Sequence, residues 1–290
     1  MAESARLAYK AYEIEELVDI YFYRRLGYVV AVSARAVHLS PNAVSVLAGV
    51  AGGIGGALIA SPRLAWIGVA LMVLHGIIDS ADGQLARMTG QTSELGRILD
   101  GLAGYVTYIA MYIAIVVLVH DRWGLAAALA AAFVSGSFTA LQAQMYDYHR
   151  TAYAAYAIKG RLPTELTQPS VGGILRPVIR FYAATQQALL GRHRVVEAQL
   201  AARAAAGAVP PADRERYRSC FYRAVRGWNL LGDNVRRYAI ALFVLLERPE
   251  WFIPFTVIGM NLVVLGLWLY QQHADQRFLA TPAAASPHTS

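Results

Sequence analysis

Long apolar stretches separated by short polar segments dominate the pattern of residues along this chain. Their lengths approach the roughly 20 residues that an α-helix needs to cross a bilayer. The pattern therefore predicts an all-α, polytopic membrane protein with six transmembrane helices. The predicted spans are residues 41–60, 64–78 with an extension to about 86, 102–119, 123–145, 234–247 with an extension upstream to about 228, and 251–270.

An amphipathic pattern precedes the first span. Apolar residues recur at helical spacing, and basic residues stand near them, at Ile14, Leu17, Val18, Tyr21 and Phe22, and at Lys10, Arg24 and Arg25. A helix of this kind lies along a membrane surface with its basic side chains near lipid phosphates. We expect such an interfacial helix on the cytoplasmic side, and a soluble helix packed on the inner loops is the alternative. Acidic residues within the stretch argue against a cleaved signal peptide.

The pattern divides the chain into five segments. These are an interfacial segment at 1–38, the first four spans at 39–146, a cytoplasmic insert at 147–226, the last two spans at 227–272 and a flexible tail at 273–290. The insert is too long for a simple connection between two helices. Its sequence assigns it no role.

Composition and charge agree with a membrane protein. Of the 290 residues, 57% are hydrophobic and only 16% are charged, and the net charge is +7. With six spans, one side of the membrane carries only Arg63, Arg122 and Arg248 among the basic residues. Because Lys and Arg accumulate on the cytoplasmic side, this predicts an integral protein of the cytoplasmic (inner) membrane, with both termini facing the cytoplasm.

The basic residues also bear on the partners. No nucleic-acid recognition motif accompanies the arginines, so nucleic acid is excluded as a partner. Anionic lipid headgroups of the membrane are the expected partners of these side chains.

The first predicted span begins at Ser40-Pro41-Asn42. Ser40 is a suitable N-cap and Pro41 fits the first helical position, while Asn42 is a candidate to face a binding site. Five glycines follow, at Gly49, Gly52, Gly53, Gly55 and Gly56. No Lys-Ser or Lys-Thr follows them, so a phosphate loop is excluded, and close helix packing through small residues is the expected role.

Acidic residues stand at the end of the second span and near the start of the third. Asp79 and Asp82 are three residues apart and so share one face of a helix, and Asp100 lies on the next helix. Carboxylates that converge in this way suit Mg²⁺, Mn²⁺ or Ca²⁺. The motif should therefore bind a divalent cation on the cytoplasmic side of the membrane.

Small and basic residues accompany these acids. Gly83 and Ala86 remove side-chain bulk on the same helical face, and Arg87 supplies a forked donor for phosphate groups. The combination indicates metal-assisted chemistry on a nucleotide diphosphate. The alternative is a set of interfacial acids paired with Arg87 and Arg97, but it leaves the joint spacing of acids and small residues unexplained.

The stretch resembles the signature of the membrane-embedded CDP-alcohol phosphotransferases, D-x-x-D-G-x-x-A-R-x8-G-x3-D-x3-D. All fixed positions but the last are present, as Asp79, Asp82, Gly83, Ala86, Arg87, Gly96 and Asp100. The resemblance extends more loosely to the amino-terminal helix, the Ser-Pro-Asn start of the first span and the six-span layout, but not clearly to the insert.

The resemblance implies a reaction and a set of roles. A substituted phosphate group passes from a CDP-linked donor to an alcohol acceptor, and CMP is released; CDP-diacylglycerol is the donor that we predict. Two divalent ions, Mg²⁺ or Mn²⁺, are held by Asp79, Asp82 and Asp100. The remaining motif residues lie against CDP, with Asn42 as a further candidate. Asp100 also acts in catalysis, and members of the family are commonly homodimers.

The last position of the signature departs from the family. Gly104 stands where the family has an aspartate that is usually taken as the base for the acceptor hydroxyl. Either another group substitutes for it, or the chain is a catalytically impaired homologue that binds a CDP-lipid or regulates an active partner. His75, one turn before Asp79, is our candidate for a substitute base, and a hydrogen-bonded core histidine is the alternative.

Two further alternatives stay open at this point. Polar residues before the fifth span, at Asp233, Asn234, Arg236 and Arg237, could bind an acceptor phosphate or simply face lipid headgroups. Membrane prenyltransferases also use aspartate clusters, but their motifs lack the Gly-x-x-Ala-Arg element.

Overall fold

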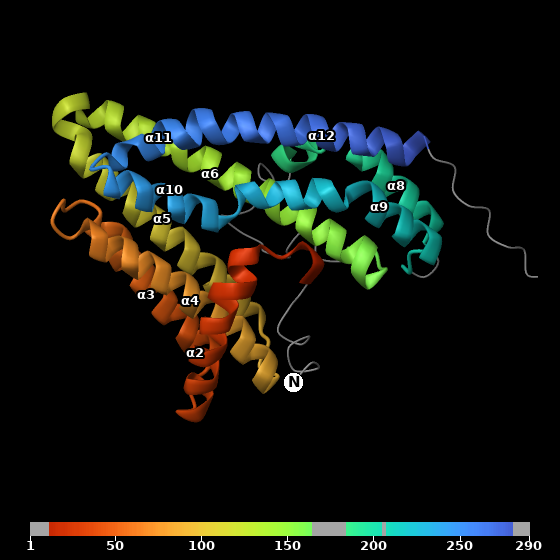
Figure 1. Cartoon of the computed structure of the whole chain (residues 1–290), viewed down its shortest axis with the longest axis horizontal. Coiled ribbons are helices and arrows are strands. Elements are labelled where there is room, and N and C mark those ends of the chain that lie inside the picture. Colours follow the sequence, from red (N-terminus) through yellow and green to blue (C-terminus); the bar gives the residue numbers. More distant parts are fainter. Residues whose placement is uncertain (1–11, 164–183, 205–206, 281–290) are drawn as a thin grey trace, which may run out of the picture. The chain divides into compact units, whose positions relative to one another are not determined.

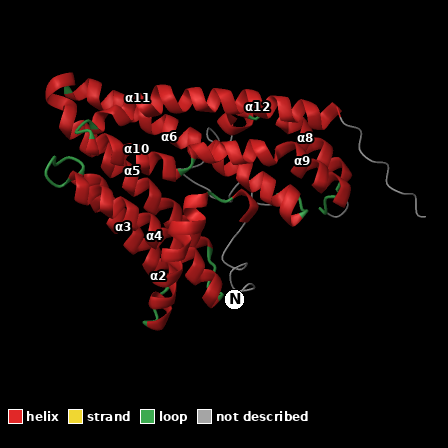
Figure 2. Ribbon diagram, in the orientation of Figure 1, coloured by secondary structure: helices red, strands yellow, loops and turns green. Residues whose placement is uncertain are grey.

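The structure, a computed structural model, describes residues 12–163, 184–204 and 207–280. Within these ranges the chain forms helices and loops, and the pairing of Arg161 with Ala208 is an isolated bridge rather than a strand (Figure 2). The all-α prediction is therefore confirmed for the part of the chain that the structure describes.

The chain forms two compact units. The first comprises residues 1–140 and 233–260, and the second comprises residues 141–232 and 261–290. These boundaries differ from those of the five segments expected from the sequence. Helix α6, Leu125–Tyr153, has residues in both units.

The first unit carries the motif on α4, Ala65–Thr89, and α5, Glu94–Trp123 (Figure 1). The other helices that lie wholly in this unit are η1 Tyr12–Ile14, η2 Asp19–Tyr23, α2 Arg24–Ala36, α3 Pro41–Leu58, α10 Asp233–Leu245, η6 Pro249–Trp251, α11 Phe252–Pro254 and η7 Phe255–Met260. The second unit adds η3 Ala154–Lys159, α8 His193–Arg203, α9 Pro211–Trp228, η5 Asn229–Leu231 and α12 Asn261–Ala280.

Among the described residues, five helical stretches are long and apolar enough to cross a membrane. They are Pro41–Leu58, Ala65–Thr89, Ile98–Trp123, Leu125–Lys159 and Pro249–Ala280. They correspond to the first four predicted spans and to the sixth. The fifth predicted span falls on α10, which has 13 residues and is shorter than a crossing requires. A sixth crossing stays a prediction.

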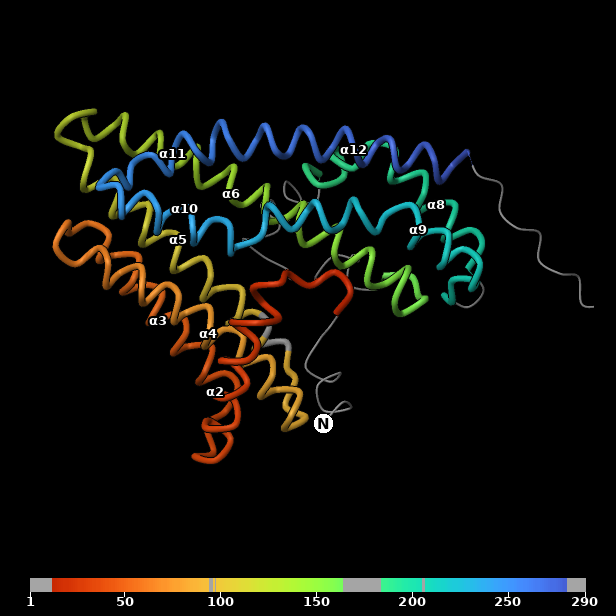
Figure 3. Tube along the Cα trace, viewed as in Figure 1, coloured from red at the N-terminus to blue at the C-terminus, as the bar shows by residue number. Residues whose placement is uncertain are grey.

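Helix α3 packs on both α4 and α5, whereas α4 and α5 contact each other little. Glycines permit this close approach. A Cβ on Gly52 would lie 1.8 Å from Thr107 Oγ1 of α5, and a Cβ on Gly55 would lie 2.8 Å from the Gly68 carbonyl oxygen of α4. The expected packing role of the glycine-rich span is confirmed, and it makes α3 the element that holds α4 and α5 together (Figure 3).

Local signals in the sequence set the ends of these helices. The Ser40 hydroxyl accepts a hydrogen bond from the Ala43 amide, and Pro41 follows as the first helical residue, as predicted. Gly90, with a φ of 68°, ends α4 in the left-handed conformation that glycine adopts without strain. The Ser93 hydroxyl then accepts from the Gly96 amide and starts α5. The motif therefore lies on the last turns of one helix and the first turns of the next.

The amino-terminal segment packs on α4 through α2. Glu15 is 2% exposed and accepts hydrogen bonds from the guanidinium group of Arg24. Leu17, Tyr21 and Phe22 are exposed, as an interfacial helix requires. Its position at a membrane surface stays a prediction, and Lys10 lies outside the described residues.

The second unit contains a buried polar network. His193 and Asp275 are fully buried, and Nδ1 of His193 lies 2.7 Å from the Asp275 carboxylate. Because a carboxylate only accepts, Nδ1 of His193 donates to Asp275. Nε2 of the same ring lies 3.2 Å from the Tyr217 hydroxyl. Burial, followed by the charge of Glu197, raises the pKa of Tyr217 well above its usual range, so the phenol stays a donor.

We predict that Gly56→Ala destabilises the protein by about 1–3 kcal/mol, because overpacking a close contact has that effect. The new Cβ would lie 2.6 Å from the Thr107 carbonyl oxygen and 2.7 Å from the Met111 amide nitrogen. Thermal unfolding in detergent measures the change. The matched control is Gly101→Ala, where a Cβ meets nothing within 4 Å and helix propensity improves by up to ~1 kcal/mol. Equal stability of the two variants would contradict the packing role of Gly56.

Candidate active site

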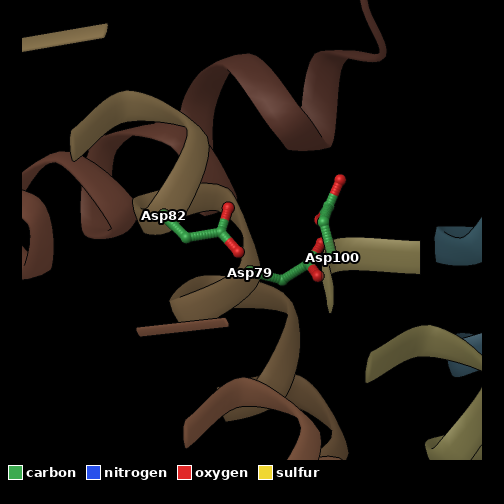
Figure 4. Close-up of side chains that lie close together, drawn as sticks. All are labelled: Asp79, Asp82 and Asp100. Carbon is green, nitrogen blue, oxygen red and sulfur yellow. The ribbon is translucent and has the colours of Figure 1, made fainter. Parts of the chain in front are cut away.

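Three carboxylates form the acidic cluster, which we define as Asp79, Asp82 and Asp100. Asp79 and Asp82 come from α4 and Asp100 from α5, and one oxygen of each lies within 4.8 Å of the others (Figure 4). The structure thus brings together the three residues that the spacing of the motif predicted. Asp82 is 5% exposed, whereas Asp100 is open to solvent.

The donor set of the cluster fits a divalent cation. Carboxylate oxygens are the ligands that Mg²⁺, Mn²⁺ and Ca²⁺ prefer. Each of the charges of Asp82 and Asp100 acts unfavourably on ionised Asp79. A bound cation would relieve this repulsion, so the chemistry of these residues and their separation suit a metal site.

Ser45 of α3 supports the cluster, and sequence reasoning did not single it out. Its hydroxyl donates a hydrogen bond to Asp82 Oδ2, and Ser45 itself is 3% exposed. The spacing of Asp82 from Ser45 along the chain carries no signal for this contact. The one signal in the sequence was that Ser45 is polar and follows Asn42 by one turn in a largely apolar span.

Other predicted site residues lie on the same helix ends. Asn42 lies against Gly96, since a Cβ on Gly96 would be 3.0 Å from the Asn42 side-chain oxygen. Among the described residues, a Cβ on Gly83 would meet only the guanidinium group of Arg87, at 3.4 Å, so the backbone at Gly83 is open to approach. Ala86 follows one turn after Asp82 and is partly exposed. The CDP-binding roles of these residues stay predictions.

Arg87 is exposed and lies among charged residues of the first unit. The charged groups that act on it are Asp82, Glu15 and Arg24. Sequence reasoning considered a pairing of Arg87 with the acids as the alternative to phosphate binding. The solvent exposure of Arg87 leaves it accessible to a ligand.

Residue 104 borders open space. A Cβ on Gly104 would meet no described heavy atom within 4 Å. His75, the candidate base, is 4% exposed and has Nδ1 2.9 Å from the Ala48 carbonyl oxygen of α3. Because a carbonyl only accepts, Nδ1 carries the proton, and Nε2 of the neutral ring is left as the acceptor. The role of His75 stays a prediction, and its ring lies beside Gly52 of α3.

The polar residues at the start of α10 lie beside α4 and α5. The Tyr108 hydroxyl of α5 donates to Asp233 Oδ1 at 3.4 Å. Arg237 lies against α4, because a Cβ on Gly76 would be 2.7 Å from its Nη1. Sequence reasoning left the residues at the start of α10 open between acceptor binding and lipid contact.

The fold and the acidic cluster define a polytopic, all-α membrane protein with a carboxylate site at the ends of two helices. Comparison with family models then gives the affiliation. The model described as CDP-alcohol phosphatidyltransferase matches residues 38–190, just over half of the chain. The chain belongs to this family, whose members transfer a phosphatidyl group from a CDP-linked donor to an alcohol in lipid synthesis.

The match covers more than the motif. It continues into residues 147–190 of the predicted insert, which the resemblance of the motif did not clearly reach. No match to a curated protein or to a solved structure was found.

We predict that Ser45→Ala weakens metal binding. Loss of the hydroxyl removes the side-chain donor that Asp82 has in α3, and loss of such outer partners typically reduces metal affinity by about 10–100-fold. Isothermal titration of the detergent-solubilised protein with Mn²⁺ measures the affinity. Ser137→Ala is the control, because the exposed Ser137 hydroxyl donates to the Phe133 carbonyl oxygen, away from the cluster. Unchanged Mn²⁺ affinity in Ser45→Ala would count against the supporting role of Ser45.

Proposed function

We propose that the protein is a divalent-metal-dependent transferase that moves a substituted phosphate group from CDP-diacylglycerol to a small hydroxylated acceptor, with release of CMP. The observation that carries this proposal is the convergence of Asp79, Asp82 and Asp100 within 4.8 Å, in a chain that belongs to the CDP-alcohol phosphatidyltransferase family. The product belongs to phospholipid or related polar-lipid synthesis.

In this proposal, different residues bind the metal ions and the nucleotide. Asp79, Asp82 and Asp100 hold Mg²⁺ or Mn²⁺, with two ions as the expected number. Bound ions neutralise the diphosphate and the charge that develops on the departing CMP. Gly83 and Ala86 admit the nucleotide to the backbone of α4, because neither carries a bulky side chain.

Arg87, Asn42 and Gly96 complete the donor site in this proposal. The exposed Arg87 guanidinium binds phosphate oxygens through its forked donors. Asn42 lies against Gly96, which supports a shared role of these two residues at the nucleotide. Asp100 is the exposed member of the cluster. It precedes by four residues Gly104, the position at which the family has its base for the acceptor hydroxyl.

The proposal includes a location. The excess of basic residues on one side of the predicted spans supports an integral protein of the cytoplasmic membrane with its site facing the cytoplasm. A homodimer rests on the family resemblance alone and stays a prediction.

A second function is favoured by one observation. Gly104 supplies neither a proton acceptor nor a metal ligand, and open space borders it. A catalytically impaired homologue would bind a CDP-lipid, or regulate an active partner, without transfer. Both functions require metal-dependent binding of CDP, but only the transferase releases CMP.

We predict that the purified protein releases CMP from CDP-dioleoylglycerol in the presence of Mn²⁺, and that Asp79→Asn reduces this release by at least about 100-fold, because removing a group that stabilises developing charge has an effect of that order. Chromatographic quantification of CMP is the measurement, with removal of Mn²⁺ by a chelator as a second condition.

The control variant is Asp121→Asn, at an exposed carboxylate near the end of α5. It should retain the wild-type rate. Metal-dependent CDP binding without any CMP release would favour the impaired homologue, and absence of both would refute the proposed function.

A further inference from the structure

Gly104 leaves the motif without its last carboxylate, and Tyr108 lies one turn further along the same helix. Gly104 follows Asp100 by four residues on α5, and Tyr108 follows Gly104 by another four, so the three share one helical face. Long side chains of a helix lean toward its amino terminus. A side chain at Tyr108 that follows this rule leans toward the turn of α5 that carries Gly104.

The first residue of α10 meets Tyr108 at this place. The Tyr108 hydroxyl donates to Asp233 Oδ1 at 3.4 Å, and Arg236 Nη1 donates to the same oxygen at 3.1 Å. Both donors reach one oxygen of the carboxylate. They orient the Asp233 side chain and leave Oδ2 to face another group.

A second contact places the start of α10 against α4, near Asp79. Arg237 lies one turn after Asp233 and fills the space that Gly76 leaves on α4. Gly76 is three residues before Asp79, and Tyr108 is four residues after Gly104. The start of α10 therefore contacts α4 and α5 within one turn of Asp79 and of Gly104 respectively.

The electrostatic surroundings agree with this position. The charge of Asp233 acts on both Asp79 and His75. The guanidinium groups of Arg236 and Arg237 are the cations that act on the Asp233 carboxylate. The side chain of Asp233 is 49% exposed, so an acceptor can approach it. His75 is almost completely buried.

We propose that Asp233, supplied by α10, is the carboxylate that accepts the hydroxyl proton of the acceptor in place of the aspartate missing at residue 104. The assignment rests on the proposed function and deepens it. In the step, the acceptor O–H bond breaks and its proton passes to Asp233 Oδ2. The acceptor oxygen bonds to the lipid-bearing phosphorus, and the bond from that phosphorus to the oxygen of CMP breaks with its electron pair on CMP.

Arg236 and Tyr108 are positioning residues in this arrangement. Arg236 is 1% exposed, and its second amino group donates to the Thr139 carbonyl oxygen, so its guanidinium group is held in place. A carboxylate oriented in this way needs little rearrangement when the acceptor arrives.

The experiment compares transfer and binding in the same variants. Transfer is CMP release from CDP-dioleoylglycerol with Mn²⁺ and, in turn, glycerol 3-phosphate, L-serine and myo-inositol as acceptors. Binding is Mn²⁺-dependent affinity for CDP, measured by isothermal titration. We expect Asp233→Asn to reduce transfer by about 10²–10⁴-fold, the usual contribution of a positioned base, with CDP affinity within about twofold of wild type.

Rescue distinguishes a catalytic role from a structural one. Gly104→Asp, introduced into the Asp233→Asn protein, restores a carboxylate to the same space and should recover transfer by at least about tenfold, on the scale of general-base contributions. Asp121→Asn, at the exposed carboxylate far along α5, should leave transfer and binding unchanged.

Other results overturn the assignment. Unchanged transfer in Asp233→Asn would do so, as would equal losses of transfer and CDP affinity, or failure of Gly104→Asp to rescue. A larger loss of transfer in His75→Gln than in Asp233→Asn would move the role to His75. A wild-type protein that binds CDP with Mn²⁺ but releases no CMP with any of these acceptors would also refute Asp233 as a working base. Absence of CDP binding in the wild type would refute the proposed function itself.

Discussion

The site depends on the close approach of α3 to α4 and α5. The two helices that carry the acidic cluster contact each other little, and α3 contacts both. Side chains at Gly52, Gly55 or Gly56 would collide with neighbouring atoms at less than 3 Å. Because small residues let helix backbones approach closely within a membrane, these glycines fix the distance between α4 and α5. The separation of the three carboxylates follows from that distance.

Like charges held together need compensation, and the surroundings of the cluster supply part of it. The Ser45 hydroxyl donates to Asp82, the most buried of the three. Divalent cations would supply the rest, as carboxylate clusters inside membranes are costly unless they are paired or bind ions. Through Ser45, α3 contacts the acidic cluster directly in addition to packing on both helices.

The start of α10 connects the site to the amino-terminal segment. The Asn234 amide group donates to Glu16 and to Asp19, each at 2.9 Å, and its oxygen accepts from Arg237. Arg237 in turn lies against α4 at Gly76 and over the Tyr23 ring. The segment that the sequence predicts at the membrane surface is thus linked by hydrogen bonds to Arg237, which lies against Gly76, one turn before Asp79.

The sequence by itself determined the helical class, the position of the acidic motif, the Ser40 cap and the packing role of the glycines. These features follow from local spacing and local hydrogen bonds, which a single segment contains. Only the tertiary structure decided three hydrogen bonds. They join Ser45 to Asp82, His75 to the Ala48 carbonyl oxygen, and Tyr108 to Asp233. These contacts join residues far apart in the chain, and their geometry depends on how helices pack rather than on any spacing along one of them.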